Sequence, residues 1–208
     1  MKICFLYINY NGEKDLQRNL SKIIKGCLET QIDIIVTDDN SSDNSWEIIK
    51  KIEVYKTKNK SQNRGFASNV NNGLKFSSKI DNYDFFIISN SDLNFELINF
   101  EILKTIISKS IKTYPKMGIL GFNEVNSSNL FEAQKRELNV NEVTNVPGCF
   151  FVLAKNLINK IGYLDEDYFM YGEDNDYFFR CKKNNFMILK SNYNIMHFSE
   201  GSSENKLK

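Results

Sequence analysis

An alternation of short apolar runs with longer amphipathic segments is the feature that most constrains the fold. The short runs are rich in β-branched and aromatic residues, and they tend to end in Asn, Asp, Ser or Gly. This pattern is typical of βαβ units and predicts an α/β domain with an open sheet. We expect strands at 2–8, 33–37, 51–57, 84–89, 117–122, 146–154, 186–190 and 192–198, and helices at 13–30, 46–52, 66–76, 99–112 and 173–184.

Length and charge narrow the classes of protein that this chain can represent. Its 208 residues fit a single domain, expected over residues 1–200, and the tail at 201–208 is expected to be flexible. The formal net charge is +1, from 27 basic and 26 acidic residues, and no block of like charge stands out. Net electrostatics therefore provides no basis for binding nucleic acid.

Cysteine spacing and hydropathy narrow the classes further. The four cysteines (Cys4, Cys27, Cys149 and Cys181) are far apart and form no CxxC pair, which argues against a zinc ribbon, a thioredoxin-type site and a dense disulfide scaffold. A reducing cytoplasm is the predicted setting. No apolar run approaches the roughly 20 residues that cross a bilayer. We expect no transmembrane segment, while peripheral contact with a membrane stays open.

Polar side chains follow three of the expected strands, in the segments 9–11, 38–45 and 90–92. An open α/β sheet binds its ligands at the carboxyl ends of its strands, so these segments are expected to converge on one crevice. Neither GxGxxG nor GxxxxGK[ST] occurs in the chain, so dinucleotide-binding and P-loop functions are not supported.

Two of these segments carry carboxylates with more than one possible role. Asp92, at the tip of the strand that ends "FFIISNSD", could hold a divalent cation that neutralises a diphosphate, or it could cap a turn. Asp38 and Asp39 could accept hydrogen bonds from a base imide or a ribose hydroxyl, or they could belong to a capping turn. The only histidine, His197, is either a packed residue or a metal ligand.

The stretch "YGEDNDYFFR" (171–180) contains three carboxylates that helical geometry separates. A helix that begins near Glu173 puts Asp174 on one face with the apolar residues three, four and seven positions later, so Asp174 is expected to point inward. Asp176 precedes Arg180 by four residues, the spacing of a surface ion pair, and Glu173 is expected to flank the inward face. The inward acid could be a helix cap or a general base, and geometry leaves both open.

The chain resembles the family 2 glycosyltransferases, particularly the bacterial branch that includes rhamnosyltransferase-like enzymes. The resemblance covers nearly the whole chain and rests on the order and spacing of six segments. These are "YINYNG", "VTDDNSSDNS", "NRGFASNVNNGL", "FFIISNSDLNF", "VPGCFFVLAKNLINKIGYLDEDYFMYGEDNDYFFR" and "MHFSEGSS".

The resemblance implies the GT-A fold, a Rossmann-like mixed sheet flanked by helices, with a nucleotide-binding half (1–95) and an acceptor and catalytic half (96–200). It implies that Asp174 is the catalytic base and that Asp92 and His197 bind Mg²⁺ or Mn²⁺. Asn90 replaces the first aspartate of a strict DxD motif, so the metal has one carboxylate fewer. The residues expected to bind the nucleotide sugar are Asn9, Tyr10, Asp38, Asn63, Arg64, Gly65, Asn90, Gly148 and Glu173.

The activity that follows from the resemblance is transfer of a sugar, with inversion, from a UDP- or dTDP-sugar to an acceptor hydroxyl. The acceptor is expected to be a saccharide or a lipid-linked saccharide in bacterial surface polysaccharide synthesis, used in the cytoplasm or at the inner face of the membrane. A catalytically silent nucleotide-sugar-binding or scaffold protein of the same fold is the alternative. A sugar-phosphate nucleotidyltransferase is less well supported, because no glycine-rich, arginine-containing loop follows the first strand.

Overall fold

The expected alternation of strands and helices folds around one mixed sheet, seen in a computed structural model that describes residues 1–125 and 137–197. The described part of the chain contributes nine strands to the sheet. The strands are β1 (Ile3–Asn9), β2 (Asp33–Asp38), β3 (Tyr55–Lys58), β4 (Phe85–Asn90), β5 (Leu93–Asn94), β6 (Met117–Val125), β7 (Val140–Glu142), β8 (Phe150–Ala154) and β9 (Met187–His197). The helices are α1 (Glu13–Thr30), α2 (Ser45–Lys50), α3 (Phe66–Ser77), α4 (Phe100–Thr113), α6 (Lys155–Ile161) and α7 (Glu173–Lys183), with a 3₁₀ turn, η1, at Phe95–Leu97.

The strand order is β3-β2-β1-β4-β8-β6-β9-β5, and β7 pairs with β9. Strands β1 to β4 are parallel to their neighbours within this group, as repeated βαβ units require. Strand β8 is antiparallel to both β4 and β6, and β5 is antiparallel to β9. The sheet is therefore mixed, as expected, with a parallel first half.

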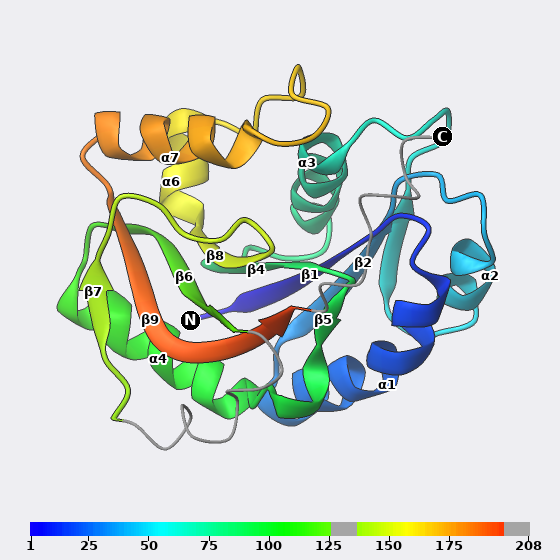
Figure 1. The fold of residues 1–208 in the computed structure, drawn as a ribbon, viewed down its shortest axis with the longest axis horizontal. Coiled ribbons are helices and arrows are strands. Elements are labelled where there is room, and N and C mark those ends of the chain that lie inside the picture. The colour runs from blue at the N-terminus through cyan, green and yellow to red at the C-terminus, as the bar shows by residue number, and fades with distance from the viewer. Residues whose placement is uncertain (126–136, 198–208) are drawn as a thin grey trace.

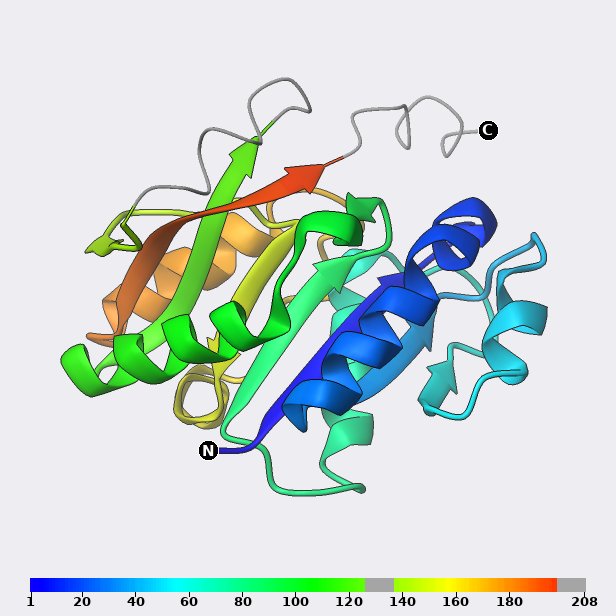
Figure 2. The same ribbon diagram turned by 90° about the horizontal axis from the view of Figure 1, so that it is seen from below.

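Helices cover both faces of the sheet, because the strand residues that point to either face are mostly apolar. Figure 1 shows α3, α6 and α7 on one face and α1 and α4 on the other, and Figure 2 shows α1 and α4 from their own side. In β1, Phe5 packs in the core with α1 and α4, whereas Leu6 packs in the core with α3, α6 and α7. The two cores lie on opposite faces of the central strands.

Several elements differ from the sequence-based expectation. Helix α6 was not expected; its seven residues follow β8 directly and are too few to display a clear helical period. The short strands β5 and β7 were also not expected, and β3 begins at Tyr55 rather than Lys51. None of the helices among residues 1–125 and 137–197 combines the length and the apolar character needed to cross a bilayer.

The two strands expected at 186–190 and 192–198 are one continuous strand, β9. The expected strands were separated at Ser191, within the polar run 190–192. In the structure the register with β6 shifts between Gly121 and Asn123, and β9 places additional residues opposite this point. Asn192, within the irregularity, accepts a hydrogen bond from the backbone of Asn139, so its polarity is satisfied at the sheet. The tail expected at 201–208 lies outside the described residues.

Candidate functional site

The carboxyl ends of β1, β2 and β4 meet where the strand order reverses. From β1 the chain proceeds to β2 and β3 on one side and then crosses to β4 on the other. Asn9 therefore lies beside Asp38, and Ile8 lies beside Asn90. Open α/β sheets bind ligands at such a switch point, and a cavity of about 310 Å³ lies there.

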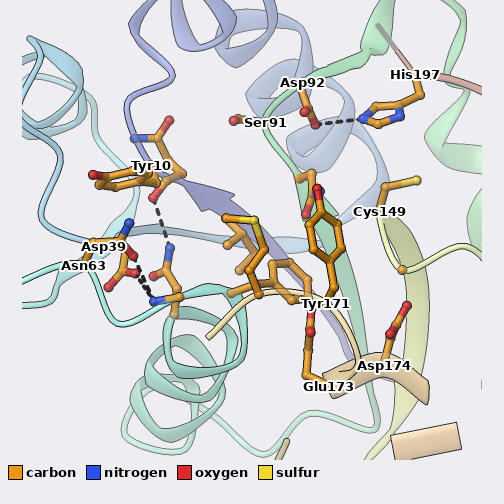
Figure 3. Close-up of a pocket in the computed structure, with 18 residues that line it drawn as sticks. Tyr10, Asp39, Asn63, Ser91, Asp92, Cys149, Tyr171, Glu173, Asp174 and His197 are labelled. Atoms are coloured by element: carbon orange, nitrogen blue, oxygen red, sulfur yellow. Dashed lines mark hydrogen bonds and ion pairs between the residues drawn. The ribbon is translucent and has the colours of Figure 1, made fainter. Parts of the chain in front are cut away.

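The cavity gathers residues from both halves of the chain. Figure 3 shows Tyr10, Asp39 and Asn63 on one side, Asp92 and His197 on a second side, and Glu173 and Asp174 of α7 on a third. Asp38 and Arg64 are the two predicted site residues that do not line it. The ten that do are Asn9, Tyr10, Asn63, Gly65, Asn90, Asp92, Gly148, Glu173, Asp174 and His197.

Asp38, which was expected to bind the donor, lies outside the lining of the cavity. Asp38 is fully buried, and it accepts hydrogen bonds from Asn9 Nδ2 (2.9 Å) and from the backbone and hydroxyl of Ser41 (3.0 and 2.6 Å). Its carboxylate is thus taken up by the turn that follows β2. Consecutive residues near a strand end point in opposite directions, so only one of two adjacent acids can face the cavity.

Of these two adjacent acids, Asp39 is the one that lines the cavity, and the sequence analysis had named it only as a possible partner of Asp38. Its Oδ2 accepts hydrogen bonds from the backbone nitrogens of Arg64 and Gly65, each at 2.9 Å, and Asn59 donates to its Oδ1. Burial is the main reason that the pKa of Asp39 lies above its usual value, although the hydrogen bond from Asn59 opposes this shift. The only sequence feature that could have indicated Asp39 as a lining residue is the pair of adjacent acids at the end of a buried strand.

Asn63 and Gly65 line the cavity, whereas the cationic side chain of Arg64 does not. The Arg64 guanidinium pairs with Glu166 Oε2 at 3.1 Å, and its side chain is half exposed. Asn63 Oδ1 accepts a hydrogen bond from the Gly65 nitrogen at 2.8 Å. Gly65 has φ +86°, and a Cβ there would collide with the carbonyl oxygen of Phe169. Arg64, which was expected to line the nucleotide pocket, is therefore not among the residues that line the cavity.

Asp92 and His197 come together because β5 pairs with β9, with Leu93 opposite His197. His197 Nε2 lies 3.2 Å from Asp92 Oδ1 (Figure 3). The neighbouring Asp92 carboxylate is the largest cause that raises the pKa of His197, and burial opposes this shift. Tyr7 and Asn19 both donate to the backbone oxygen of Ser91, at 3.0 and 3.1 Å, and so hold the loop that carries Asp92.

The donors at this end of the cavity fit a divalent cation. A carboxylate and an imidazole are both ligands of Mn²⁺, and Mg²⁺ prefers oxygen. Two neighbouring ligands of an octahedral ion with bonds of about 2.1 Å are about 3 Å apart, close to the separation of Asp92 Oδ1 and His197 Nε2. Asn90 Oδ1 is buried nearby without a hydrogen-bond partner among the described residues. Single ligand atoms of Glu124, Cys149 and His197 also lie within 4.8 Å of one another.

Both acids at the start of α7 line the cavity, and the order of their burial is the reverse of the expectation. Glu173 is buried, at 6% exposed, whereas Asp174 is partly exposed. The apolar face of a helix is more than 100° wide, so it can include both acids. Glu173 lies four residues before the buried Tyr177, and Asp174 lies four residues before the buried Phe178. The pKa of Glu173 is raised mainly by burial, and its Oε2 has no hydrogen-bond partner among the described residues.

Asp174 approaches the backbone closely across the cavity. A Cβ added to Gly148 would lie 2.7 Å from Asp174 Oδ2, so glycine at this position makes room for the carboxylate. Asp174 Oδ1 accepts a hydrogen bond from the nitrogen of Asn175 at 2.8 Å. The expected pair of Asp176 with Arg180 is confirmed, with Arg180 Nε 2.7 Å from Asp176 Oδ2.

Sequence reasoning also missed lining residues from α3 and from the segment before α7. Asn69 is buried, donates to the backbone oxygen of Asn9 at 3.0 Å, and has an Oδ1 without a hydrogen-bond partner among the described residues. A polar residue on the apolar face of the expected helix 66–76 was a usable signal for Asn69. Tyr171, with φ +66° and 74% exposed, lies at the mouth of the cavity, and no pattern marked it.

Sequence comparisons identify the family to which this chain is similar. The pattern described as Glycosyl transferase family 2 matches residues 4–162. The low-salt glycan biosynthesis hexosyltransferase Agl10 of Haloferax volcanii is 24% identical over 200 residues, covering 89% of this chain and 63% of that protein. The poly-beta-1,6-N-acetyl-D-glucosamine synthase of Staphylococcus epidermidis is 27% identical over 184 residues, covering 79% of this chain and 42% of that protein. The chain thus spans less than two thirds of the length of either relative.

Solved structures share the fold. The mannosyltransferase PcManGT from Pyrobaculum calidifontis, in complex with GDP-Man and Mn²⁺, superposes with a TM-score of 0.72 at 12% identity, covering 96% of this chain and 58% of that one. Residues 1–349 of TarS from S. aureus, in complex with UDP-GlcNAc, give a TM-score of 0.64 at 20% identity, covering 97% and 57%. The expected GT-A fold is confirmed.

Proposed function

Because the chain belongs to glycosyl transferase family 2, we propose that it transfers a hexose-type sugar, with inversion, from a UDP- or dTDP-sugar to an acceptor hydroxyl. One observation supports this function above all others. A single cavity contains a hydrogen-bonding end around Asp39, a cation-binding pair at Asp92 and His197, and a carboxylate at Asp174. A nucleotide, a diphosphate and an acceptor hydroxyl need these three kinds of group.

The nucleotide binds at the end formed by β1 and the segment 63–65. Tyr10 supplies an aromatic ring to the base, and Asp39 and Asn63 supply hydrogen-bond acceptors within the same lining. Asn69 Oδ1 is buried without a hydrogen-bond partner among the described residues, so it is available to the donor, whereas Asn9 Oδ1 lies beside Gly12 at the start of α1. The complexes of PcManGT with GDP-Man and of TarS with UDP-GlcNAc support a nucleoside diphosphate sugar as the ligand class.

The diphosphate lies at Asp92 and His197, which would hold Mg²⁺ or Mn²⁺. A bound divalent cation supplies positive charge against the diphosphate as it departs. Cys149 lies between this pair and Asp174 (Figure 3), and Asn90, Ser91 and Gly148 also line the cavity. This order of groups puts the sugar between the diphosphate and the carboxylate of α7.

Asp174 acts as the general base. Its carboxylate takes the proton from the acceptor hydroxyl as the oxygen forms its bond to the anomeric carbon. The bond from that carbon to the diphosphate oxygen breaks on the opposite face, and its electron pair leaves with the diphosphate. The neighbouring Glu173, whose Oε2 is buried without a partner among the described residues, accepts a hydrogen bond from a sugar hydroxyl.

The acceptor is a saccharide or a lipid-linked saccharide that enters past the aromatic segment before α7. Phe169 and Tyr171 are exposed, at 49% and 74%, and Tyr171 lines the cavity mouth. Exposed aromatic faces suit the apolar face of a sugar ring. The names of the two curated relatives support glycan or polysaccharide synthesis as the setting. The proposal includes bacterial surface polysaccharide as the product and the cytoplasm, beside the inner face of the membrane, as the location.

Removing divalent cations is expected to abolish transfer. Excess EDTA should stop the release of nucleoside diphosphate, and added Mn²⁺ or Mg²⁺ should restore it, because Asp92 and His197 alone cannot offset the diphosphate charge. A coupled assay for nucleoside diphosphate, run across a panel of nucleotide sugars, measures this. Undiminished transfer in EDTA would exclude the cation role of Asp92 and His197.

Replacing Tyr171 with alanine is expected to raise the KM for the acceptor by about 2- to 10-fold, since an aromatic contact is worth about 0.5–1.5 kcal/mol. Slow donor hydrolysis should be unchanged, because it needs no acceptor. Tyr55→Ala is the matched control: Tyr55 is also exposed, at 48%, but lies on the edge strand β3 away from the cavity. An unchanged acceptor KM in Tyr171→Ala would contradict the proposed acceptor path.

A protein that only binds nucleotide sugars would show neither transfer nor hydrolysis.

A further inference from the structure

His197, the only histidine of the chain, lies between two carboxylates from different strands. Its Nε2 is 3.2 Å from Asp92 Oδ1, and its Nδ1 is 2.9 Å from Glu124 Oε1. Asp92 lines the cavity, whereas Glu124 lies outside the lining, on the far side of the imidazole. The parallel pairing of β6 with β9, which sets Glu124 opposite Ile195, brings Glu124 to the ring.

We propose that Glu124 is a positioning residue that keeps the proton of the neutral imidazole on Nδ1 and so presents the Nε2 lone pair to a cation shared with Asp92. The proposal rests on the cation role given to Asp92 and His197 above. In the function proposed above, Glu124 neither contacts the donor nor binds the cation, so this role is additional to it.

The chemistry of the imidazole ring supports this assignment. A neutral ring carries one proton, and the nitrogen without it has the lone pair that binds a metal. An ionised carboxylate only accepts hydrogen bonds, and carboxylates face both ring nitrogens. Only Nδ1 is in hydrogen-bond geometry, 2.9 Å from Glu124 Oε1, whereas Nε2 has no hydrogen-bond partner among the described residues, so the proton is favoured on Nδ1. The opposite tautomer would point a proton from Nε2 at Asp92 and block the space between them. Carboxylate partners of this kind orient metal-binding histidines in proteins generally.

Glu124 can be altered without disturbing the core. It lies near the end of β6, and its side chain is 36% exposed. Glu124→Gln retains a carbonyl oxygen that can accept from Nδ1, whereas Glu124→Ala removes the acceptor. Glu101→Ala, which changes an exposed carboxylate on α4, is the matched control.

The first experiment observes the proton directly. Untagged protein labelled with ¹⁵N-histidine gives one pair of ring nitrogens, because the chain has a single histidine. Long-range ¹H–¹⁵N spectra of the neutral ring, with and without saturating Mg²⁺, should show the proton on Nδ1 in the wild type and in Glu124→Gln. Glu124→Ala should shift the population toward a proton on Nε2. A proton on Nε2 in the wild type, or an unchanged tautomer in Glu124→Ala, would overturn the inference.

The second experiment measures cation affinity without turnover. The electron paramagnetic resonance signal of free Mn²⁺ reports binding, and Glu124→Ala is expected to weaken it by about 10- to 100-fold. Glu124→Gln should lose less, and Glu101→Ala should match the wild type. Equal Mn²⁺ affinity in Glu124→Ala and the wild type would refute the positioning role. If the wild type bound no Mn²⁺, the proposed cation role itself would fail, and the metal-free spectra would decide the role of Glu124 separately.

Discussion

Replacing Asp174 with asparagine is expected to lower the rate of sugar transfer by about 10² to 10⁴, the usual contribution of a positioned general base. Asparagine has nearly the same shape but cannot take the proton of the acceptor hydroxyl. Donor binding should survive, because the nucleotide end around Asp39 lies elsewhere in the cavity. The measurement is kcat for transfer, together with the thermal shift that the donor produces with Mn²⁺.

Asp176→Asn is the matched control for this variant. Asp176 lies two residues further along α7, pairs with Arg180 and does not line the cavity. Its exchange should leave kcat close to the wild-type value, because a partly exposed ion pair contributes little. A folded Asp174→Asn protein that transfers sugar at nearly the wild-type rate would show that another group is the base. The buried carboxylate of Glu173 would then be the next candidate.

The second large effect is expected for stability in Gly65→Ala. Gly65 has φ +86° and ψ 175°, a backbone region that is nearly restricted to glycine, and adopting it with a side chain costs about 1–3 kcal/mol. The added Cβ would also collide with the carbonyl oxygen of Phe169, which adds about 1–3 kcal/mol of steric cost. Urea unfolding should therefore show a marked loss of unfolding free energy, and the segment 168–171 should move away from the cavity.

Gly162→Ala separates the two contributions. Gly162 has φ +81° and ψ −162°, almost the same backbone conformation, but nothing lies within 4 Å of a Cβ built there. This variant should show the backbone cost alone. If Gly65→Ala were no less stable than Gly162→Ala, the close contact of Gly65 with Phe169 would not constrain the cavity mouth.

Much of the fold was predictable because strands and helices have different periods. The elements β1, α1, β2, α3, β4, α4 and α7 occur within a few residues of the expected positions. Helix α6 and strands β5 and β7 were missed because each is too short to show a period. The polar middle of β9 concealed its continuity, since the irregular pairing that accommodates Asn192 involves a distant strand.

The candidate site was predictable only in outline. Polar residues after β1, β2 and β4 were expected to converge, and Asn9, Asn90 and Asp92 do line one cavity. The choice between Asp38 and Asp39 was not predictable, because it depends on which acid the turn after β2 engages. The contact of Glu124 with His197 gave no signal, because the two residues belong to different strands far apart in the chain.

The sequence by itself determined which segments are strands or helices, where polar groups follow strands, and which residues share a helix face, including the pair of Asp176 with Arg180. These properties depend on neighbours within a few residues. Only the tertiary structure decided the antiparallel insertion of β8, the burial of Glu173, and the pairing of β5 with β9 that joins Asp92 to His197. The reason is physical: periodicity shows which face of an element is buried, whereas strand order and register depend on packing between segments that are distant along the chain.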